Sequence, residues 1–184
     1  MSFRSLTHSL LAVTGLLLAV GCGGSSSSAS ANDPNLIAAN DYEAVIGWMG
    51  DPGTISREQA HSGRYSVKVD AAHEFGMGYS LPLGKATMRK PHKIRISAWA
   101  YMVDAKSSAR LGLQIFDPAT GKETFGDGVN FNEAIKSYRK WVEISRDIVL
   151  PETTTSTQEL RVFTWRASAT TPAYIDDLRI TLVD

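Results

Sequence analysis

The sequence contains very little cysteine. Cys22 is the only one among 184 residues, so the chain can form neither an intrachain disulfide nor a zinc site built from several cysteines. It also has no net charge, because 19 Lys and Arg residues balance 19 Asp and Glu residues. Proteins that bind nucleic acid by neutralising phosphates need an excess of basic residues, so this balance argues against that class.

Patterns typical of catalytic centres are also missing. The four histidines show neither His-x-x-x-His nor His-Glu-x-x-His spacing, and Gly-x-Ser-x-Gly is absent. Two carboxylate pairs, Asp70 with Glu74 and Asp117 with Asp127, could be nominated for glycoside hydrolysis. Each carboxylate is explained more simply as the solvated end of a strand. We therefore expect a protein that is not an enzyme.

The apolar run near the start, Leu10 to Val20, is too short to cross a membrane, because a spanning helix needs roughly 20 apolar residues. It follows a short polar start that includes Arg4, as the central part of a secretory signal does. Its end, Leu18-Ala19-Val20-Gly21-Cys22, resembles a bacterial lipoprotein signal, in which the cysteine receives lipid and becomes the new N-terminus. An ordinary cleaved signal is the alternative.

The residues after Cys22, Gly23 to Asn32, are almost entirely Gly, Ser and Ala, a composition typical of a flexible tether. We therefore expect a signal peptide over residues 1–21, a lipidated Cys22 with its tether over 22–35, and one domain over 36–184. The protein would then be anchored through its lipid to a membrane of the bacterial cell envelope, facing the periplasm or the outer surface.

Alternation of apolar and polar side chains dominates the rest of the chain and predicts an all-β domain, because successive side chains of a strand point to opposite faces. Turn sequences such as Asp117 to Lys122 separate the runs, and Asn132 to Tyr138 is the best candidate for a helix. Many short strands at even spacing indicate a two-sheet β-sandwich of the jelly-roll type. The expected strands are Arg64–Asp70, Lys93–Val103, Arg110–Asp117, Glu159–Arg166 and Tyr174–Val183, together with a stretch that contains Val142, Ile144 and Ile148 and ends at Pro151.

In several of the expected strands, aromatic side chains alternate with the aliphatic residues of the core, so they lie on the opposite face of the strand. If their strands share a sheet, they form a solvent-facing platform that suits the C–H faces of sugar rings, with planar polar groups for the hydroxyls. The alternatives are that a loop or helix covers this face, or that the two faces are reversed. The candidate ligand-binding residues are Trp99, Tyr101, Phe163 and Trp165 as stacking groups, and Arg95, Gln114 and Arg161 as polar partners.

The order of motifs resembles that of jelly-roll carbohydrate-binding modules of the galactose-binding-like superfamily. The matching segments are Asn40-Asp41-Tyr42-Glu43 with Trp48, Gln59 to Val69, Ile94 to Tyr101, Trp141-Val142, and Tyr174 to Ile180. The resemblance implies a two-sheet β-sandwich that binds a polysaccharide or another glycan without catalysis. A surface domain that binds a protein, or that serves as a spacer, is the alternative function.

The same resemblance implies a structural calcium ion. In that family, the glutamate of the opening motif and an aspartate of the closing pair commonly hold the ion, which here corresponds to Glu43 and Asp177, with Asp176 as the other candidate. Calcium takes six to eight oxygen ligands, so backbone carbonyls would complete the site. Neighbouring residues of a strand point to opposite faces, so one aspartate of the pair is expected to serve.

Overall fold

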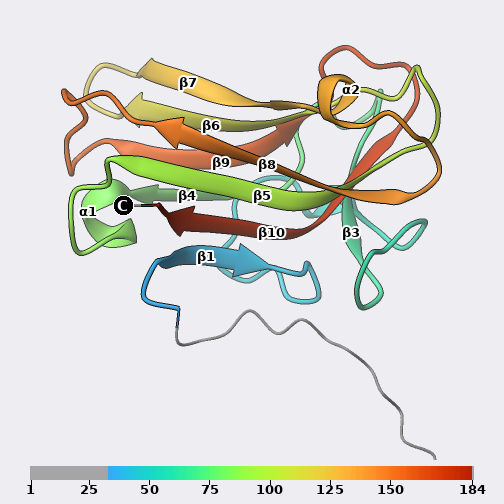
Figure 1. Ribbon diagram of the computed structural model, residues 1–184, viewed down its shortest axis with the longest axis horizontal. Coiled ribbons are helices and arrows are strands. Elements are labelled where there is room, and N and C mark those ends of the chain that lie inside the picture. The colour runs from blue at the N-terminus through green and yellow to red at the C-terminus, as the bar shows by residue number, and fades with distance from the viewer. Residues whose placement is uncertain (1–32, 184) are drawn as a thin grey trace, which may run out of the picture.

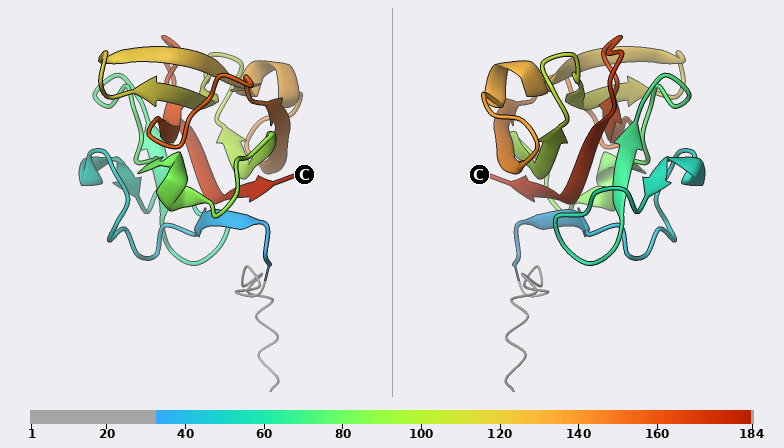
Figure 2. Two further views of the ribbon diagram at one scale, coloured as in Figure 1. Left: turned by 90° about the vertical axis from the view of Figure 1, so that its left-hand side faces the viewer. Right: turned by 90° about the vertical axis from the view of Figure 1, so that its right-hand side faces the viewer.

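The computed structural model describes residues 33–183. They form a β-sandwich of two antiparallel sheets, one of six strands and one of four (Figures 1 and 2). The larger sheet has the order β2-β3-β10-β5-β8, with β1 also paired to β10, and the smaller sheet has the order β4-β9-β6-β7. The two-sheet β-sandwich expected from the sequence is confirmed.

The strands of the larger sheet are β1 (Leu36–Asn40), β2 (Ile55–Ser56), β3 (Ser66–Val69), β5 (Lys93–Met102), β8 (Trp141–Val149) and β10 (Ala173–Leu182). Those of the smaller sheet are β4 (Tyr79–Pro82), β6 (Arg110–Asp117), β7 (Lys122–Asn130) and β9 (Glu159–Trp165). Three single turns of helix lie between strands: η1 (Pro52–Thr54), α1 (Leu83–Ala86) and α2 (Phe131–Ala134). No helix among residues 33–183 is long and apolar enough to cross a membrane.

The core lies between the two sheets and consists of the aliphatic positions that the alternation predicts. Along β5, for example, Ile94, Ile96 and Ala98 are buried, while Arg95 is exposed. Burying an isoleucine side chain stabilises the fold by about 1.5–3 kcal/mol. The alternation of such residues therefore determines which face of each strand is directed toward the core. The other buried hydrophobic residues of the long strands are Ala100, Met102, Leu111, Leu113, Ile115, Ile144, Ile148, Leu160, Val162, Ala173, Tyr174, Ile175, Leu178, Ile180 and Leu182.

Strand β10 has two different neighbours along one of its edges. Its first residues, Ala173 to Ile175, pair with β3, and its later residues, Leu178 to Thr181, pair with β1. Between these stretches, the pairing of β10 with β5 is irregular, and Asp177 has a left-handed backbone with φ of 49°. The closing Asp176-Asp177 pair therefore lies where β10 exchanges one partner strand for another.

The first 32 residues lie outside the described part of the chain. The predicted signal peptide, Cys22 and most of the predicted tether fall there, so the structure does not test them. The described chain begins at Asp33, whose carboxylate pairs with Arg179 of β10 at 2.9 Å.

Candidate functional site

The structure divides the seven predicted ligand-binding residues between opposite sides of the molecule. Trp99, Tyr101 and Arg95 lie on β5 in the six-stranded sheet, whereas β6 and β9 belong to the four-stranded sheet. The expectation of one shared platform is therefore wrong, because it required these strands to lie in one sheet. The remaining four residues, which share the outer side of the smaller sheet, are Gln114, Arg161, Phe163 and Trp165.

On the six-stranded sheet, other parts of the fold already pack against the aromatic side chains. The imidazole of His61 stacks on Trp99, with ring centroids 3.9 Å apart and an angle of 11° between the planes. Tyr101 contacts the rings of Trp141 and Tyr174 at 5.5 and 5.9 Å. The loop that contains His61 thus covers Trp99, which was the alternative left open by the sequence.

Arg95, the polar residue predicted on the same strand, is also engaged. Its guanidinium donates to both carboxylate oxygens of Asp147 on β8, at 2.5 and 2.9 Å. The ion pair lies on an exposed surface, where solvent and salt screen the attraction between the two charges. Arg95, Trp99 and Tyr101 thus act within the six-stranded sheet, and none of them contributes to the outer side of the smaller sheet.

The outer side of the four-stranded sheet presents an aromatic surface, which we call the Phe163 face. Phe75 forms an isolated bridge with Trp165, and its ring lies edge-on to Phe163 at 5.8 Å. Phe75 retains 55% of its exposure, and Phe163 and Trp165 are half-buried. The face comprises Phe75, Arg110, Gly112, Gln114, Phe116, Glu123, Glu159, Arg161, Phe163 and Trp165.

Polar partners hold the side chains of the Phe163 face in fixed positions. Arg161 donates to Glu159 at 2.6 Å, and its guanidinium carbon lies 3.5 Å from the ring centre of Phe116. Gln114 donates its amide to Glu123 at 2.5 Å. These pairs leave planar donors and acceptors beside aromatic rings, an arrangement that suits recognition of a polyhydroxylated ligand because little side-chain freedom remains to be lost on binding.

Three glycines lie on the part of the face beside Phe163, and two of them, Gly112 and Gly128, are buried, while Gly126 is exposed. Gly112 lies opposite Phe163 on β9 and opposite Gly128 on β7, and Gly126 lies opposite Gln114. A Cβ at Gly112 would meet the ring of Phe163 at 3.7 Å, an ordinary contact. A Cβ at Gly128 would instead lie 2.3 Å from the carbonyl oxygen of Leu111. The glycine strip, Gly112, Gly126 and Gly128, therefore combines one position with room and one that requires glycine.

The three predicted calcium ligands anchor the loop between β2 and β3 by hydrogen bonds. Asp176 accepts from the backbone N–H groups of His61 and Ser62 at 2.8 and 3.2 Å. Asp177 contacts His61 Nδ1 at 2.5 Å and accepts from Ser62 Oγ at 2.7 Å. These N–H groups lie where β10 changes its partner strand, so the carboxylates replace missing sheet acceptors.

Glu43 binds the next part of the same loop. Its Oε1 accepts from the backbone N–H groups of Arg64 and Tyr65 at 2.6 and 2.8 Å, and these bonds lower the pKa of the carboxyl. Burial and, to a smaller extent, the charge of Asp177 together raise the pKa of Asp176 to about 6, although its backbone hydrogen bonds oppose the rise.

As arranged, the three carboxylates face hydrogen-bond donors. No group of three or more His, Cys, Asp or Glu residues within 33–183 is placed to hold a metal ion. This arrangement does not by itself fit a calcium ion, which would have to replace several of these hydrogen bonds. The calcium site at Glu43, Asp176 and Asp177 stays a prediction from the resemblance.

Sequence reasoning missed three components of the Phe163 face. Phe75 lies in a segment without alternation, and only its bridge to Trp165 brings it to the sheet. Glu123 belongs to β7, whose polar and glycine-rich sequence gave no strand pattern. Glu159 was recognised as the start of a strand, but its pairing with Arg161 was not. Residues two positions apart on a strand lie on the same face, so the spacing of Glu159 and Arg161 could have indicated that the two side chains pair.

Comparison with known proteins identifies the family. Residues 34–171 match the model of a family described as carbohydrate binding domain. No curated protein matches the chain.

Among solved structures, the CBM22-1 xylan-binding domain of Xyn10C from Paenibacillus barcinonensis is 19% identical, with a TM-score of 0.55 over 82% of this chain and 96% of that one. The C-terminal family 22 carbohydrate binding module of Xyn10B from Clostridium thermocellum is 17% identical, with a TM-score of 0.58 over 81% and 94%. A family 16 carbohydrate binding module is 16% identical, with a TM-score of 0.52 over 80% and 99%.

At these identities the solved structures show a common fold, and the family match carries the assignment. The match spans most of the described sandwich, including the strands that form the Phe163 face. The chain therefore belongs to the carbohydrate binding domain family.

Proposed function

We propose that the protein binds a β-linked polysaccharide of the xylan type on its Phe163 face, without catalysing a reaction. One observation carries the proposal: half-buried Phe163 and Trp165 and exposed Phe75 adjoin a glycine strip on the outer side of one sheet. Two of the structurally similar proteins are named as xylan-binding or as modules of the same family 22, which supports this choice of ligand.

The geometry suits an extended chain that crosses the strands. Neighbouring strands lie about 4.8 Å apart, so the row from Phe163 on β9 through Gly112 on β6 to Gly128 on β7 spans roughly 10 Å. The apolar face of a sugar ring would lie on the Phe163 ring, which itself lies against buried Gly112. Arg161 and Gln114, one row further along their strands, would donate hydrogen bonds to hydroxyl groups.

We also propose that the domain is held at a membrane of the bacterial cell envelope through lipid on Cys22. Support for this part comes from the sequence alone, namely the apolar run that ends at Gly21-Cys22 and the Gly/Ser-rich segment that follows. Such an anchor would keep the domain at the membrane while the tether leaves the Phe163 face free to meet an insoluble glycan.

Calorimetric titration of the protein with neutral xylo-oligosaccharides tests the binding proposal. Removing one stacked ring costs about 1 kcal/mol, so Phe163→Ala should weaken binding about fivefold or more. Val149→Ala, which shortens an exposed apolar side chain on β8 of the other sheet, is the matched control and should bind like the wild type. A wild-type protein that binds no glycan would favour a spacer or protein-binding domain instead.

A further inference from the structure

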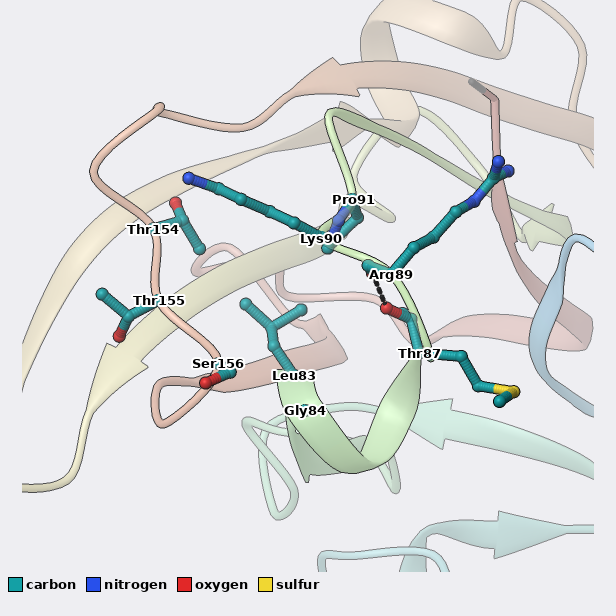
Figure 3. Close-up of a pocket in the computed structure, with 10 residues that line it drawn as sticks. Leu83, Gly84, Thr87, Arg89, Lys90, Pro91, Thr154, Thr155 and Ser156 are labelled. Atoms are coloured by element: carbon teal, nitrogen blue, oxygen red, sulfur yellow. Dashed lines mark hydrogen bonds between the residues drawn. The ribbon is translucent and has the colours of Figure 1, made fainter.

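A pocket of about 390 Å³ lies at one end of the sandwich, between α1 with the segment that follows it and the loop that precedes β9 (Figure 3). Backbone hydrogen bonds join its two walls: Leu83 N donates to the carbonyl of Gln158 at 2.8 Å, and Gly84 N donates to that of Ser156 at 2.9 Å. A Cβ at Gly84 would lie 3.1 Å from that of Ser156, so the walls approach closely there. The volume lies within the range of small-molecule sites.

The lining combines an apolar base with polar walls. Leu83 is buried beneath the pocket, and one wall carries the hydroxyl-bearing side chains of Thr154, Thr155 and Ser156. The long side chain of Lys90 extends from the opposite wall toward Thr154 (Figure 3). Apolar atoms with nearby hydroxyl groups suit a single sugar ring, and no carboxylate lines the pocket.

The two basic side chains of this pocket form no ion pair with a carboxylate within residues 33–183. Lys90 Nζ donates to the backbone carbonyl of Glu152, and Arg89 donates to the side-chain oxygen of Asn35 at 3.3 Å. Neither side chain forms an ion pair with a carboxylate of the described chain, whereas Arg95 and Arg179 both do. Lysine has three N–H donors, so Lys90 retains capacity to bind an anion.

We infer that this pocket binds an acidic sugar residue, a uronate carried as a branch or end group of the glycan. The inference rests on the proposed function and adds a second subsite to it. Ser156 precedes Glu159, the first residue of β9, by three positions, and three residues span at most about 10 Å. Glu159 itself lies four positions before Phe163, about 13 Å along β9, so a uronate reaches the pocket from the part of a glycan that extends beyond Phe163 over Glu159. Lys90 would bind the carboxylate, and Thr155 and Ser156 would face the ring hydroxyls.

Titration with a matched pair of oligosaccharides tests this inference. One is an unbranched neutral xylo-oligosaccharide, and the other has the same backbone with a single glucuronate branch. At low salt the wild-type protein should bind the branched compound about fivefold more tightly, and Lys90→Ala should abolish this preference without weakening binding of the neutral compound. Lys136→Ala is the control, because Lys136 Nζ also donates to a backbone carbonyl, that of Asn132, on an exposed surface away from the pocket.

Equal affinity of the wild type for the two compounds, or a preference that survives in Lys90→Ala, would overturn the inference. If neither compound binds, the proposed function fails, and methyl glucuronoside followed by NMR then decides the pocket separately. Shifts at the amides of Thr154 to Ser156 that disappear in Lys90→Ala would support the subsite, and unshifted amides would refute it. Methyl xyloside, which lacks the carboxylate, should leave these amides unchanged.

Discussion

Two tryptophans on opposite sheets give the sharpest test of where the ligand binds. Trp165 lies on the Phe163 face and its Nε1 donates to Glu74 at 3.0 Å, while Trp99 lies under His61 on the other sheet. We expect Trp165→Ala to lose affinity for a xylo-oligosaccharide and keep its stability, and Trp99→Ala to show the opposite pattern.

The magnitudes follow from what each ring contacts. Replacing a fully buried tryptophan by alanine costs about 3–5 kcal/mol, and Trp99 is half-buried, so its loss should cost about 2–3 kcal/mol. Removing it also releases His61, which contacts Asp177. Trp165 is half-buried as well, but no ring of the described residues stacks on it, so its removal should cost less, about 1 kcal/mol. For a chain of this size, 1 kcal/mol shifts the melting temperature by about 2–4 °C.

Thermal melts followed by circular dichroism and calorimetric titration at low temperature give both quantities for each variant. Trp165→Ala should melt within about 4 °C of the wild type and bind at least tenfold more weakly, while Trp99→Ala should melt about 5–10 °C lower with unchanged affinity. Trp165→Phe retains an aromatic ring and should recover most of the affinity. If Trp99→Ala instead loses binding while remaining stable, the site lies on the six-stranded sheet and our assignment is refuted.

Four further predictions concern other features. Gly112→Ala should keep the stability of the wild type, because the added Cβ would make only an ordinary contact with the Phe163 ring. Gly128→Ala should melt at a lower temperature, because its Cβ would lie 2.3 Å from the carbonyl oxygen of Leu111; equal melting temperatures of the two variants would contradict this. If calcium binds, EGTA should lower the melting temperature, because an ion at 100 times its Kd stabilises the folded state by about 2.7 kcal/mol. Asp177→Asn should remove that effect. Identical melting curves with and without EGTA would mean that hydrogen bonds alone anchor the loop between β2 and β3. Glu58 accepts hydrogen bonds from the ammonium group of Lys68 and the hydroxyl of Tyr174, which lower the pKa of its carboxyl. The ionised carboxylate therefore contributes stability above about pH 4.5, and this stability is lost as the pH falls through the lower pKa of the folded state. Glu58→Gln should make the melting temperature less sensitive to pH between about 6 and 3, and parallel plots of melting temperature against pH for the variant and the wild type would contradict this. Cys22→Ser should move the protein from the membrane to the soluble fraction, and retention of the variant in the membrane fraction would exclude the lipid anchor.

The alternation of side chains was sufficient to predict the long strands and the fold class. Arg110–Asp117 was predicted with the bounds that β6 has, and the ends of β5, β9 and β10 were predicted to within one residue. In these strands one face is buried, so a slip of one residue would expose the whole aliphatic set. The single helical turn within Asn132 to Tyr138 also has its counterpart in α2.

Strands without such a pattern could not be predicted in the same way. Strand β7 lies at a sheet edge and carries Gly126, Asp127 and Gly128, so neither propensity nor alternation marks it. Its pairing with β6 is set by the turn at Asp117–Lys122, where Gly121 adopts a positive φ of 68° and donates to Asp117 at 2.9 Å. The turn was recognisable from the sequence, but the strand that follows it was not.

For the candidate site, the sequence predicted the face on which each residue lies but not the sheet to which its strand belongs. Parity shows which side of a strand a residue occupies, but it carries no information on which sheet that strand joins. Trp99 and Trp165 have the same outward parity, and only the topology separates them by the full thickness of the sandwich. The stacking of His61 on Trp99 joins residues 38 positions apart through a loop, which no local pattern describes.

The described chain enters and leaves the sandwich at the same corner. Asn35, just before β1, accepts a hydrogen bond from Leu182 N at 2.8 Å, and the start of β1 lies near the end of β10 (Figure 1). Both ends of the described chain therefore lie at one corner of the sandwich, and the rest of its surface is away from them. A segment joined to either end would meet the sandwich beside the pocket, where Arg89 contacts Asn35. A circularly permuted variant that links these two ends and opens the chain at the Asp117–Lys122 turn should keep both sheets intact, because the one new connection does not have to cross them.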